Sequence, residues 1–227
     1  MLPAMSQPKA SLSGIESWVF DLDHTLYRVD HATHAAMSER ICLYLQRTLE
    51  LPRDRAFDLQ KRYLELYGST FAGLLRHHAI DRDGYHAFVN DLDLLDLKEA
   101  PELYTAIAGL QGRRIVFTNN CGHYAAQVLE RIGIADLFDD IMDARILGEA
   151  PKPNPSAYRH IASPPDATAF FDDSLRNLKP AHELGMTTIW CRTGPQGFTA
   201  PLAGRPAHVH YETDDLTQFL LNIRIGS

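Results

Sequence analysis

Short apolar runs that end abruptly in polar residues recur along this chain. Residues 15–20 form an apolar, aromatic-rich run, which is too short for a typical helix and suits a buried parallel strand. Comparable runs cover residues 115–117, 167–171 and 187–190, and a weaker one covers 141–142. Helical stretches separate them, over residues 101–110, 122–132, 155–161 and 176–184. The alternation predicts right-handed β-α-β units and a parallel sheet of the α/β class, with residues 187–190 as its last strand.

The segment between the first two predicted strands has helical periodicity throughout. Apolar side chains recur at every fourth position near its start, at Met37, Ile41, Leu45 and Leu49. The expected helices cover residues 30–50, 54–67, 71–78 and 83–90. Asp54 is the expected N-cap of the second helix. The pattern predicts an all-helical insertion directly after the first strand.

A chain of 227 residues can hold one sizeable core and a small accessory module. We assign residues 14–28 and 98–227 to an α/β core, residues 29–97 to the helical insertion, and residues 1–13 to a disordered leader. The sequence shows no signal-peptide pattern and no apolar stretch long enough to span a bilayer, so no membrane association is expected.

Composition and charge narrow the class of partner. The chain is 45% hydrophobic and 22% charged, with a formal net charge of −7. A nucleic-acid polymer is therefore not an expected partner, because such binding needs an excess of Lys and Arg. The cysteines are Cys42, Cys121 and Cys191, which form neither a zinc pattern nor a disulfide framework. This usage predicts a reducing, cytoplasmic location, and Cys121 is expected to be a small core residue.

Polar side chains follow three of the predicted strands at the point where each ends. They are Asp21 and Asp23, Thr118 and Asn119, and Asp172 and Asp173. In a parallel sheet these positions meet at one edge, where open α/β sheets bind their ligands. Lys152 precedes a predicted helix, between Pro151 and Pro153, which stiffen the loop. Asp-x-Asp pairs also occur at residues 81–83 and 91–93, but only the first pair follows a complete apolar strand.

Carboxylates, a hydroxyl, an amide and one cation are together the components of phosphoryl transfer. Asp21 is the candidate nucleophile, which would form an aspartyl-phosphate, and Asp23 is the candidate general acid and base. Thr118, Asn119 and Lys152 are the candidate phosphate-binding residues, and the first and last are also assigned to catalysis. The candidate ligands of Mg²⁺ are Asp21, Asp23, Asp172 and Asp173. This cation prefers such oxygen ligands.

These residues resemble the motifs of the haloacid dehalogenase-like superfamily of aspartate-nucleophile phosphatases. The corresponding segments are Asp21-Leu22-Asp23-His24-Thr25-Leu26, Thr118-Asn119, Lys152-Pro153 and Asp172-Asp173-Ser174. The resemblance implies a Rossmann-like three-layer sandwich and a helical cap of the C1 type that closes over the site. It also implies that the carbonyl group of Asp23 and the carboxylate of Asp173 bind the metal directly, while Asp172 acts mainly through water.

A narrower resemblance is to the pyrimidine 5′-nucleotidase branch of that superfamily. It rests on Thr25-Leu26-Tyr27 after Asp23, Tyr67-Gly68-Ser69-Thr70 with Gly73-Leu74, Asp91-Leu92-Asp93, and the segment from Phe170 to Asn177. The resemblance implies a pyrimidine nucleoside 5′-monophosphate as substrate. The substrate contacts that we assign on this basis are Tyr27, Tyr67, Thr70 and Asn120. The chain departs from the branch at His24, where Asn is usual, and at Asn120-Cys121-Gly122.

Several alternatives remain open from the sequence. The substrate could instead be phosphoglycolate or a sugar phosphate, or the chain could be a phosphomutase. A 2-haloacid dehalogenase shares the fold, but Asp23 argues against that chemistry. A non-catalytic phosphate-binding domain with the same fold is the alternative outside the enzyme class. The expected partner is a small phosphorylated metabolite, and the chain could be a monomer or a homodimer.

Overall fold

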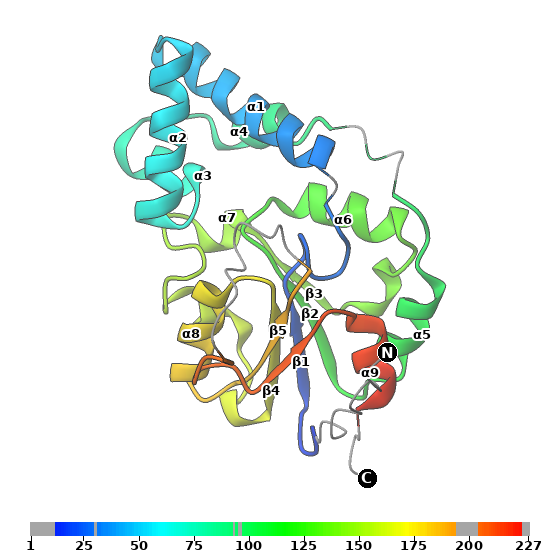
Figure 1. Cartoon of the computed structure of the whole chain (residues 1–227). Helices are drawn as coiled ribbons and strands as arrows, with labels where there is room; N and C mark the ends of the chain where they lie inside the picture. The colour runs from blue at the N-terminus through cyan, green and yellow to red at the C-terminus, as the bar shows by residue number, and fades with distance from the viewer. Residues whose placement is uncertain (1–11, 30, 93, 95–96, 194–203, 224–227) are drawn as a thin grey trace.

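The computed structural model describes residues 12–29, 31–92, 94, 97–193 and 204–223. Its centre is a six-stranded sheet in the order β3-β2-β1-β4-β5-β6, in which every neighbouring pair is parallel (Figure 1). The strands are β1 (Ser17–Phe20), β2 (Arg113–Phe117), β3 (Asp140–Met142), β4 (Thr168–Asp172), β5 (Thr187–Cys191) and β6 (Tyr211–Thr213). Because β1 lies between β2 and β4, the carboxyl ends of these three strands meet at one edge of the sheet.

Helices cover both faces of this sheet and bury it. Trp18 and Phe20 of β1 pack into one hydrophobic cluster and Val19 into another, as expected for alternate side chains of a strand. The first cluster includes residues of α5 (Pro101–Ala108), α6 (Gly122–Arg131) and α9 (Leu216–Asn222). The second includes residues of α8 (Leu175–Glu183) and the 3-10 turn η2 (Ala157–Ile161). The three-layer α/β fold predicted from the sequence is confirmed.

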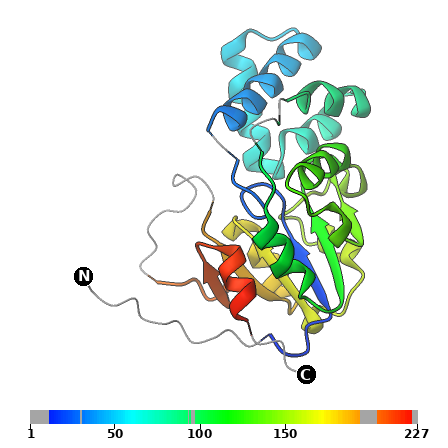
Figure 2. The same ribbon diagram turned by 90° about the vertical axis from the view of Figure 1, so that its right-hand side faces the viewer.

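A block of four helices lies beyond the carboxyl end of the sheet (Figure 1, Figure 2). It contains α1 (His31–Leu49), α2 (Arg53–Tyr67), α3 (Thr70–His77) and α4 (Arg82–Val89). These helices share a third hydrophobic cluster, with Leu45, Tyr63, Leu74 and Tyr85 among its members. Ala144 of the short helix α7 (Ala144–Leu147) also belongs to this cluster, so the block packs against the α/β core at that point. The described residues between β1 and β2 contain no strand.

The packed core starts earlier than the sequence suggested. Residues 1–11, most of the expected leader, lie outside the described residues. Leu12 is only 3% exposed and packs in the same cluster as Trp18, two residues before the expected boundary. Among the described residues, no helix has the length and apolar character needed to cross a membrane.

Three expectations about individual elements were wrong. The sheet does not end at β5, because β6 adds a further strand; its Tyr-Glu-Thr sequence lacks an apolar run and is half-buried. The helix expected over residues 155–161 is the 3-10 turn η2, which ends at Ala162 in the left-handed conformation. The N-cap of α2 is Pro52, not Asp54, which lies inside the first turn and still complements the helix dipole there.

Candidate active site

The turn after β1 is held by two buried leucines. Leu22 and Leu26 both lie in the core, and the amide of Leu26 donates to the carbonyl oxygen of Leu22 at 3.0 Å. His24 between them has a φ of 61°, which lets the chain reverse within a few residues. The reversal places Tyr27 beside Asp23, with which it forms an isolated β-bridge. The acid predicted for general acid and base catalysis is therefore fixed by its own turn.

Lys152 lies at the centre of the predicted site. Its Nζ atom donates to Oδ1 of Asp21 at 2.7 Å and to Oδ2 of Asp172 at 2.8 Å. The side chain of Lys152 is only 1% exposed, and its ammonium group lies 5.1 Å from the ring centre of Phe117 and 5.6 Å from that of Phe170. The aromatic faces add cation–π stabilisation to the two ion pairs. The loop after β3 thus brings a buried cation between the ends of β1 and β4.

The charges of Asp21, Lys152 and Asp172, which we call the triad, depend strongly on one another. The pKa of Asp21 is raised to about 7. Burial and the charges of Asp172 and Asp23 raise it, and Lys152 lowers it. Burial disfavours the ammonium form of Lys152, but Asp172 and Asp21 outweigh this cost and raise its pKa to about 12. Lys152 is therefore a permanent cation at neutral pH. A further positive charge near Asp21 would stabilise its ionised form.

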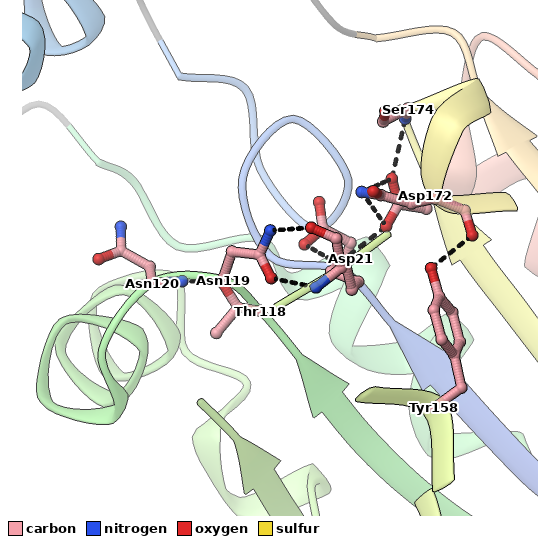
Figure 3. Close-up of polar contacts among 9 residues, drawn as sticks. Asp21, Thr118, Asn119, Asn120, Tyr158, Asp172 and Ser174 are labelled. Carbon is pink, nitrogen blue, oxygen red and sulfur yellow. Dashed lines mark hydrogen bonds and ion pairs between the residues drawn. The ribbon is translucent and has the colours of Figure 1, made fainter. Parts of the chain in front are cut away.

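Asp172 and Asp173 have different surroundings although they are adjacent. Asp172 is fully buried, and its carboxylate accepts from the amide of Ser174 at 2.8 Å and from the side chain of Asn177 at 3.0 and 3.1 Å (Figure 3). Burial raises the pKa of Asp173 to about 9, and the neighbouring carboxylates raise it as well. Carboxylate oxygens of Asp21, Asp172 and Asp173 all lie within 4.8 Å of one another. This oxygen donor set fits Mg²⁺, with Asp173 as the carboxylate that has fewer protein partners.

Asp23 differs from Asp21 and Asp172 because its hydrogen-bond partners are neutral side chains. Burial raises its pKa, whereas hydrogen bonds from Tyr27 and Asn120 lower it. The hydroxyl of Tyr27 donates to Oδ1 of Asp23 at 2.6 Å. Tyr27 and Asn120, which we assigned to substrate contact, are thus both brought to Asp23.

The residues after β2 divide into two roles. Thr118 is 1% exposed and lies at the strand end, where its Oγ1 accepts from the amide of Asn120 at 3.0 Å. The side chain of Asn119 accepts from the amide of Lys152 and donates to the carbonyl oxygen of Lys152, both at 2.9 Å (Figure 3). Because both polar atoms of this side chain are engaged, it positions the backbone of Lys152. A phosphate contact by Asn119 stays a prediction.

The two candidate substrate contacts in the helical block are engaged within that block. The hydroxyl of Tyr67 bonds to Nε2 of His77 at 2.6 Å. Thr70 is buried and donates to the carbonyl oxygen of Gln60 at 3.3 Å. Both hydroxyls thus have partners within the helical block, and a contact between them and the substrate stays a prediction.

Other residues support the site without having been assigned to it. Asn177 holds both oxygens of Asp172, and Tyr124 of α6 contacts the hydroxyl of Tyr27 at 2.7 Å. Asn177 lies in the nucleotidase-like segment from Phe170 to Asn177, but its position in the sequence did not indicate a contact with Asp172. Cys121 is buried in the core, where burial raises the pKa of its thiol, in agreement with its expected packing role.

Comparisons with known proteins agree with this arrangement. A family model of the haloacid dehalogenase-like hydrolases matches residues 16–185. The chain is 29% identical over 187 residues to phosphate metabolism protein 8 of Saccharomyces cerevisiae, across 74% of this chain and 58% of that protein. The chain thus spans a little over half the length of this curated relative.

Solved structures share the fold at low sequence identity. CbbY from Rhodobacter sphaeroides in complex with phosphate has a TM-score of 0.60 and 20% identity, over 90% of this chain and 96% of that one. The putative HAD-hydrolase YfnB from Bacillus subtilis bound to magnesium has a TM-score of 0.53 and 19% identity, over 93% and 99%. A predicted phosphoglycolate phosphatase from Haemophilus somnus has a TM-score of 0.51 and 18% identity, over 80% and 87%. The sequence match over most of the chain, joined to the sheet order and the buried acidic site, shows that the chain belongs to the haloacid dehalogenase-like hydrolases.

Proposed function

We propose that the chain is a Mg²⁺-dependent phosphomonoesterase that works through an aspartyl-phosphate. The observation that carries this proposal is the buried Lys152, whose ammonium group joins Asp21 to Asp172 while Asp173 lies within metal-binding distance of both. A nucleophilic carboxylate beside a fixed cation suits an anionic electrophile such as a phosphate group.

The structure brings the carboxylates of Asp21, Asp172 and Asp173 together, and they would hold the metal, Asp172 through water. The carbonyl group of Asp23 is a further proposed ligand of Mg²⁺, on the basis of the family resemblance. When bound, this ion neutralises charge on the phosphate oxygens and on the nucleophile. Without it, two anionic groups a few ångströms apart would repel each other by several kcal/mol, on the order of 4 kcal/mol at an effective dielectric constant of 20.

In the first step, a carboxylate oxygen of Asp21 forms a bond to phosphorus. The bond between phosphorus and the leaving oxygen breaks, its electron pair stays on that oxygen, and Asp23 donates the proton that neutralises it. Lys152 favours the ionised form of Asp21 and holds it in place, and Asn119 holds the backbone of Lys152. Thr118 lies at the adjacent strand end, where its hydroxyl is the proposed ligand of a phosphate oxygen.

In the second step, water attacks phosphorus and Asp23 accepts its proton. The bond between phosphorus and the oxygen of Asp21 breaks, so the carboxylate is regenerated and inorganic phosphate leaves. The same side chain thus acts first as an acid and then as a base. A dehalogenase has no leaving alkoxide to protonate, so the placement of Asp23 favours phosphate ester hydrolysis.

We propose the helical block, residues 29–97, as a cap over this site. Its α2 helix ends at Gly68, whose backbone lies so near Lys152 that an added Cβ atom would come 2.5 Å from the Lys152 carbonyl oxygen. Arg176 of α8 also donates to the carbonyl oxygen of Glu65 in α2, at 3.2 Å. A movement of the block would therefore displace the loop that contains Lys152.

The proposed substrate is a small phosphomonoester, with a pyrimidine nucleoside 5′-monophosphate as the first candidate. This choice rests on the nucleotidase-like segments of the sequence. Phosphoglycolate and sugar phosphates are the alternative substrates, and the first is consistent with the name of the predicted phosphoglycolate phosphatase that shares the fold.

The proposed function is tested by the release of inorganic phosphate with Mg²⁺ and with EDTA. The substrates would be UMP, CMP, dUMP, dTMP, AMP, GMP, phosphoglycolate and sugar phosphates. Asp21→Asn is expected to lower kcat by 10³-fold or more, on the order of the loss when a nucleophile is removed. The matched control is Asp83→Asn, since Asp83 is an exposed acid in α4. Metal-independent turnover, or full activity in Asp21→Asn, would overturn the proposal.

A further inference from the structure

Two tyrosine hydroxyls lead from the interior of the core to the carboxyl group of Asp23. Tyr27 donates to Oδ1 of Asp23 at 2.6 Å, a length in the range of charge-assisted O–H···O⁻ bonds. The hydroxyl of Tyr27 also lies 2.7 Å from that of Tyr124. Because a tyrosine has one hydroxyl proton and Tyr27 gives its own to Asp23, Tyr124 is the donor to Tyr27. The order of donation is thus fixed from Tyr124 through Tyr27 to Asp23.

The two tyrosines of this hydrogen-bonded series are held by tightly packed elements. Tyr124 is fully buried in α6, within the main hydrophobic cluster. Tyr27 packs against the same cluster and is tied to Asp23 by the β-bridge of the turn. The flanking residue Leu26 is 4% exposed, so the turn has little room to shift. Asp23 is therefore held by a partner whose own position is set by core packing.

We infer that Tyr27 is a positioning residue for the general acid and base, with Tyr124 behind it, and does not bind substrate. This inference rests on the proposed function. The hydroxyl of Tyr27 has one partner to which it donates and one from which it accepts, and both are protein groups. The hydrogen bond from Tyr27 to Oδ1, together with the hydrogen bond from Asn120, sets the orientation of the Asp23 carboxyl group. Tyr27 thereby orients the group that exchanges a proton with the leaving oxygen.

The role predicts a dependence on the leaving group. When the leaving oxygen is a basic alkoxide, it needs the proton of Asp23 as its bond to phosphorus breaks. When it is a nitrophenolate, it departs as a stable anion and needs no proton. Loss of the Tyr27 hydroxyl should therefore harm the first kind of substrate and spare the second. A residue that binds the phosphate or supports the fold would affect both kinds equally.

The experiment compares kcat/KM for Tyr27→Phe and wild type on three phosphomonoesters in the presence of Mg²⁺. These are the best alkyl phosphate from the substrate screen, phenyl phosphate and 2,4-dinitrophenyl phosphate. The ratio kcat/KM reports the steps up to formation of the aspartyl-phosphate, so the later hydrolysis step does not enter. We expect a loss of roughly tenfold or more with the alkyl phosphate and less than about twofold with the dinitrophenyl ester.

Two further variants make the result interpretable. Tyr124→Phe removes the donor to Tyr27 and should show the same selectivity with a smaller loss, roughly threefold with the alkyl phosphate. Tyr104→Phe is the matched control, because Tyr104 is an exposed tyrosine that donates to Asp136 at 3.1 Å, and it should leave all ratios unchanged.

The outcomes separate this inference from the proposed function. An equal loss on all three esters in Tyr27→Phe, or no loss on any, would overturn the positioning role while the wild type remained an active phosphatase. If Tyr27→Phe did not fold, the same selectivity in Tyr124→Phe would support the role, and its absence there would reject it. A wild-type chain that released no phosphate from any ester would overturn the proposed function and this role with it.

Discussion

Replacing Lys152 with methionine would leave two buried carboxyl groups without the cation that lies between them. Methionine has a similar length and fills the same space, so the change removes charge and hydrogen bonds more than volume. The ammonium group bonds to Asp21 at 2.7 Å and to Asp172 at 2.8 Å, and the side chains of Lys152 and Asp172 are almost completely buried. Removing one partner from such a buried pair typically costs about 3–5 kcal/mol.

The cost should depend on pH in a defined direction. Burial raises the pKa of Asp21 to about 7 even with Lys152 present, and loss of the ammonium removes the interaction that lowers it. The folded variant then holds a proton on Asp21 that the unfolded chain has released above about pH 4. Its stability therefore falls as pH rises. The gap from wild type should widen between pH 5.5 and pH 8 by up to about 1.4 kcal/mol, because pH 8 lies about one unit above the wild-type pKa of about 7.

The assay is urea denaturation of both proteins in EDTA at pH 5.5 and pH 8. We expect a difference of about 3–5 kcal/mol in the free energy of unfolding at pH 8 and a smaller difference at pH 5.5. The matched control is Lys179→Met, an exposed lysine 3.8 Å from Glu183, which should cost less than about 0.5 kcal/mol. A difference below about 1 kcal/mol at pH 8, or one that does not change with pH, would show that Lys152 does not stabilise the buried carboxylates of Asp21 and Asp172.

Three further predictions concern other parts of the molecule. Mg²⁺ should raise the melting temperature more at pH 9 than at pH 6, because burial raises the pKa of Asp173 to about 9 and the ion must displace that proton; calorimetry with Asp173→Asn should show little response to Mg²⁺. Gly68→Ala should cost about 1–3 kcal/mol in urea denaturation and reduce kcat, because Gly68 has a φ of +81° and a Cβ atom there would lie 2.5 Å from the carbonyl oxygen of Lys152. The amide of Thr188 donates to Nδ1 of His210 at 3.0 Å, and burial lowers the pKa of that imidazole. The stability due to His210 should be complete above about pH 6.5 and lost as pH falls below it, so that His210→Asn weakens the acid sensitivity of unfolding.

The sequence was sufficient to predict both the strands and the site where one pattern, an apolar run followed by polar residues, marks them together. Each of β1, β2 and β4 is an apolar run followed at once by polar residues, so the strands and the site could be read together. The structure confirms the parallel sheet that places these strand ends at one edge. Lys152 follows β3 in a loop, yet the proline residues around it marked a fixed position, and its ammonium group reaches Asp21.

The sequence was insufficient where a role depends on contacts between distant segments. Asn119 was predicted to bind phosphate, and its position after Thr118 gave no sign that its side-chain amide reaches the backbone of Lys152, 33 positions away. Tyr27 was predicted to contact substrate, and its place in the motif gave no sign of its hydrogen bond to Asp23. Only the reversal of the turn at His24 brings its hydroxyl back to Asp23.

Some elements gave too little signal to be found at all. β6 has three half-buried residues and no apolar run, so nothing in its sequence separated it from a loop. The contact between Tyr27 and Tyr124 spans 97 positions and depends on how α6 packs against the turn after β1. Spacing along the chain cannot reveal such a contact, because packing of the whole core determines it.

In the proposed mechanism, Asp21 attacks phosphorus and carries the phosphoryl group between the two steps. The most direct test is to mix the protein with Mg²⁺ and a substrate that it hydrolyses, quench the reaction in acid within the first turnover, and map the digest by mass spectrometry. We expect one phosphoryl group on the carboxylate of Asp21, sensitive to hydroxylamine and absent from Asp21→Asn. Turnover without any phosphorylated Asp21, or a phosphoryl group on another residue, would contradict the mechanism.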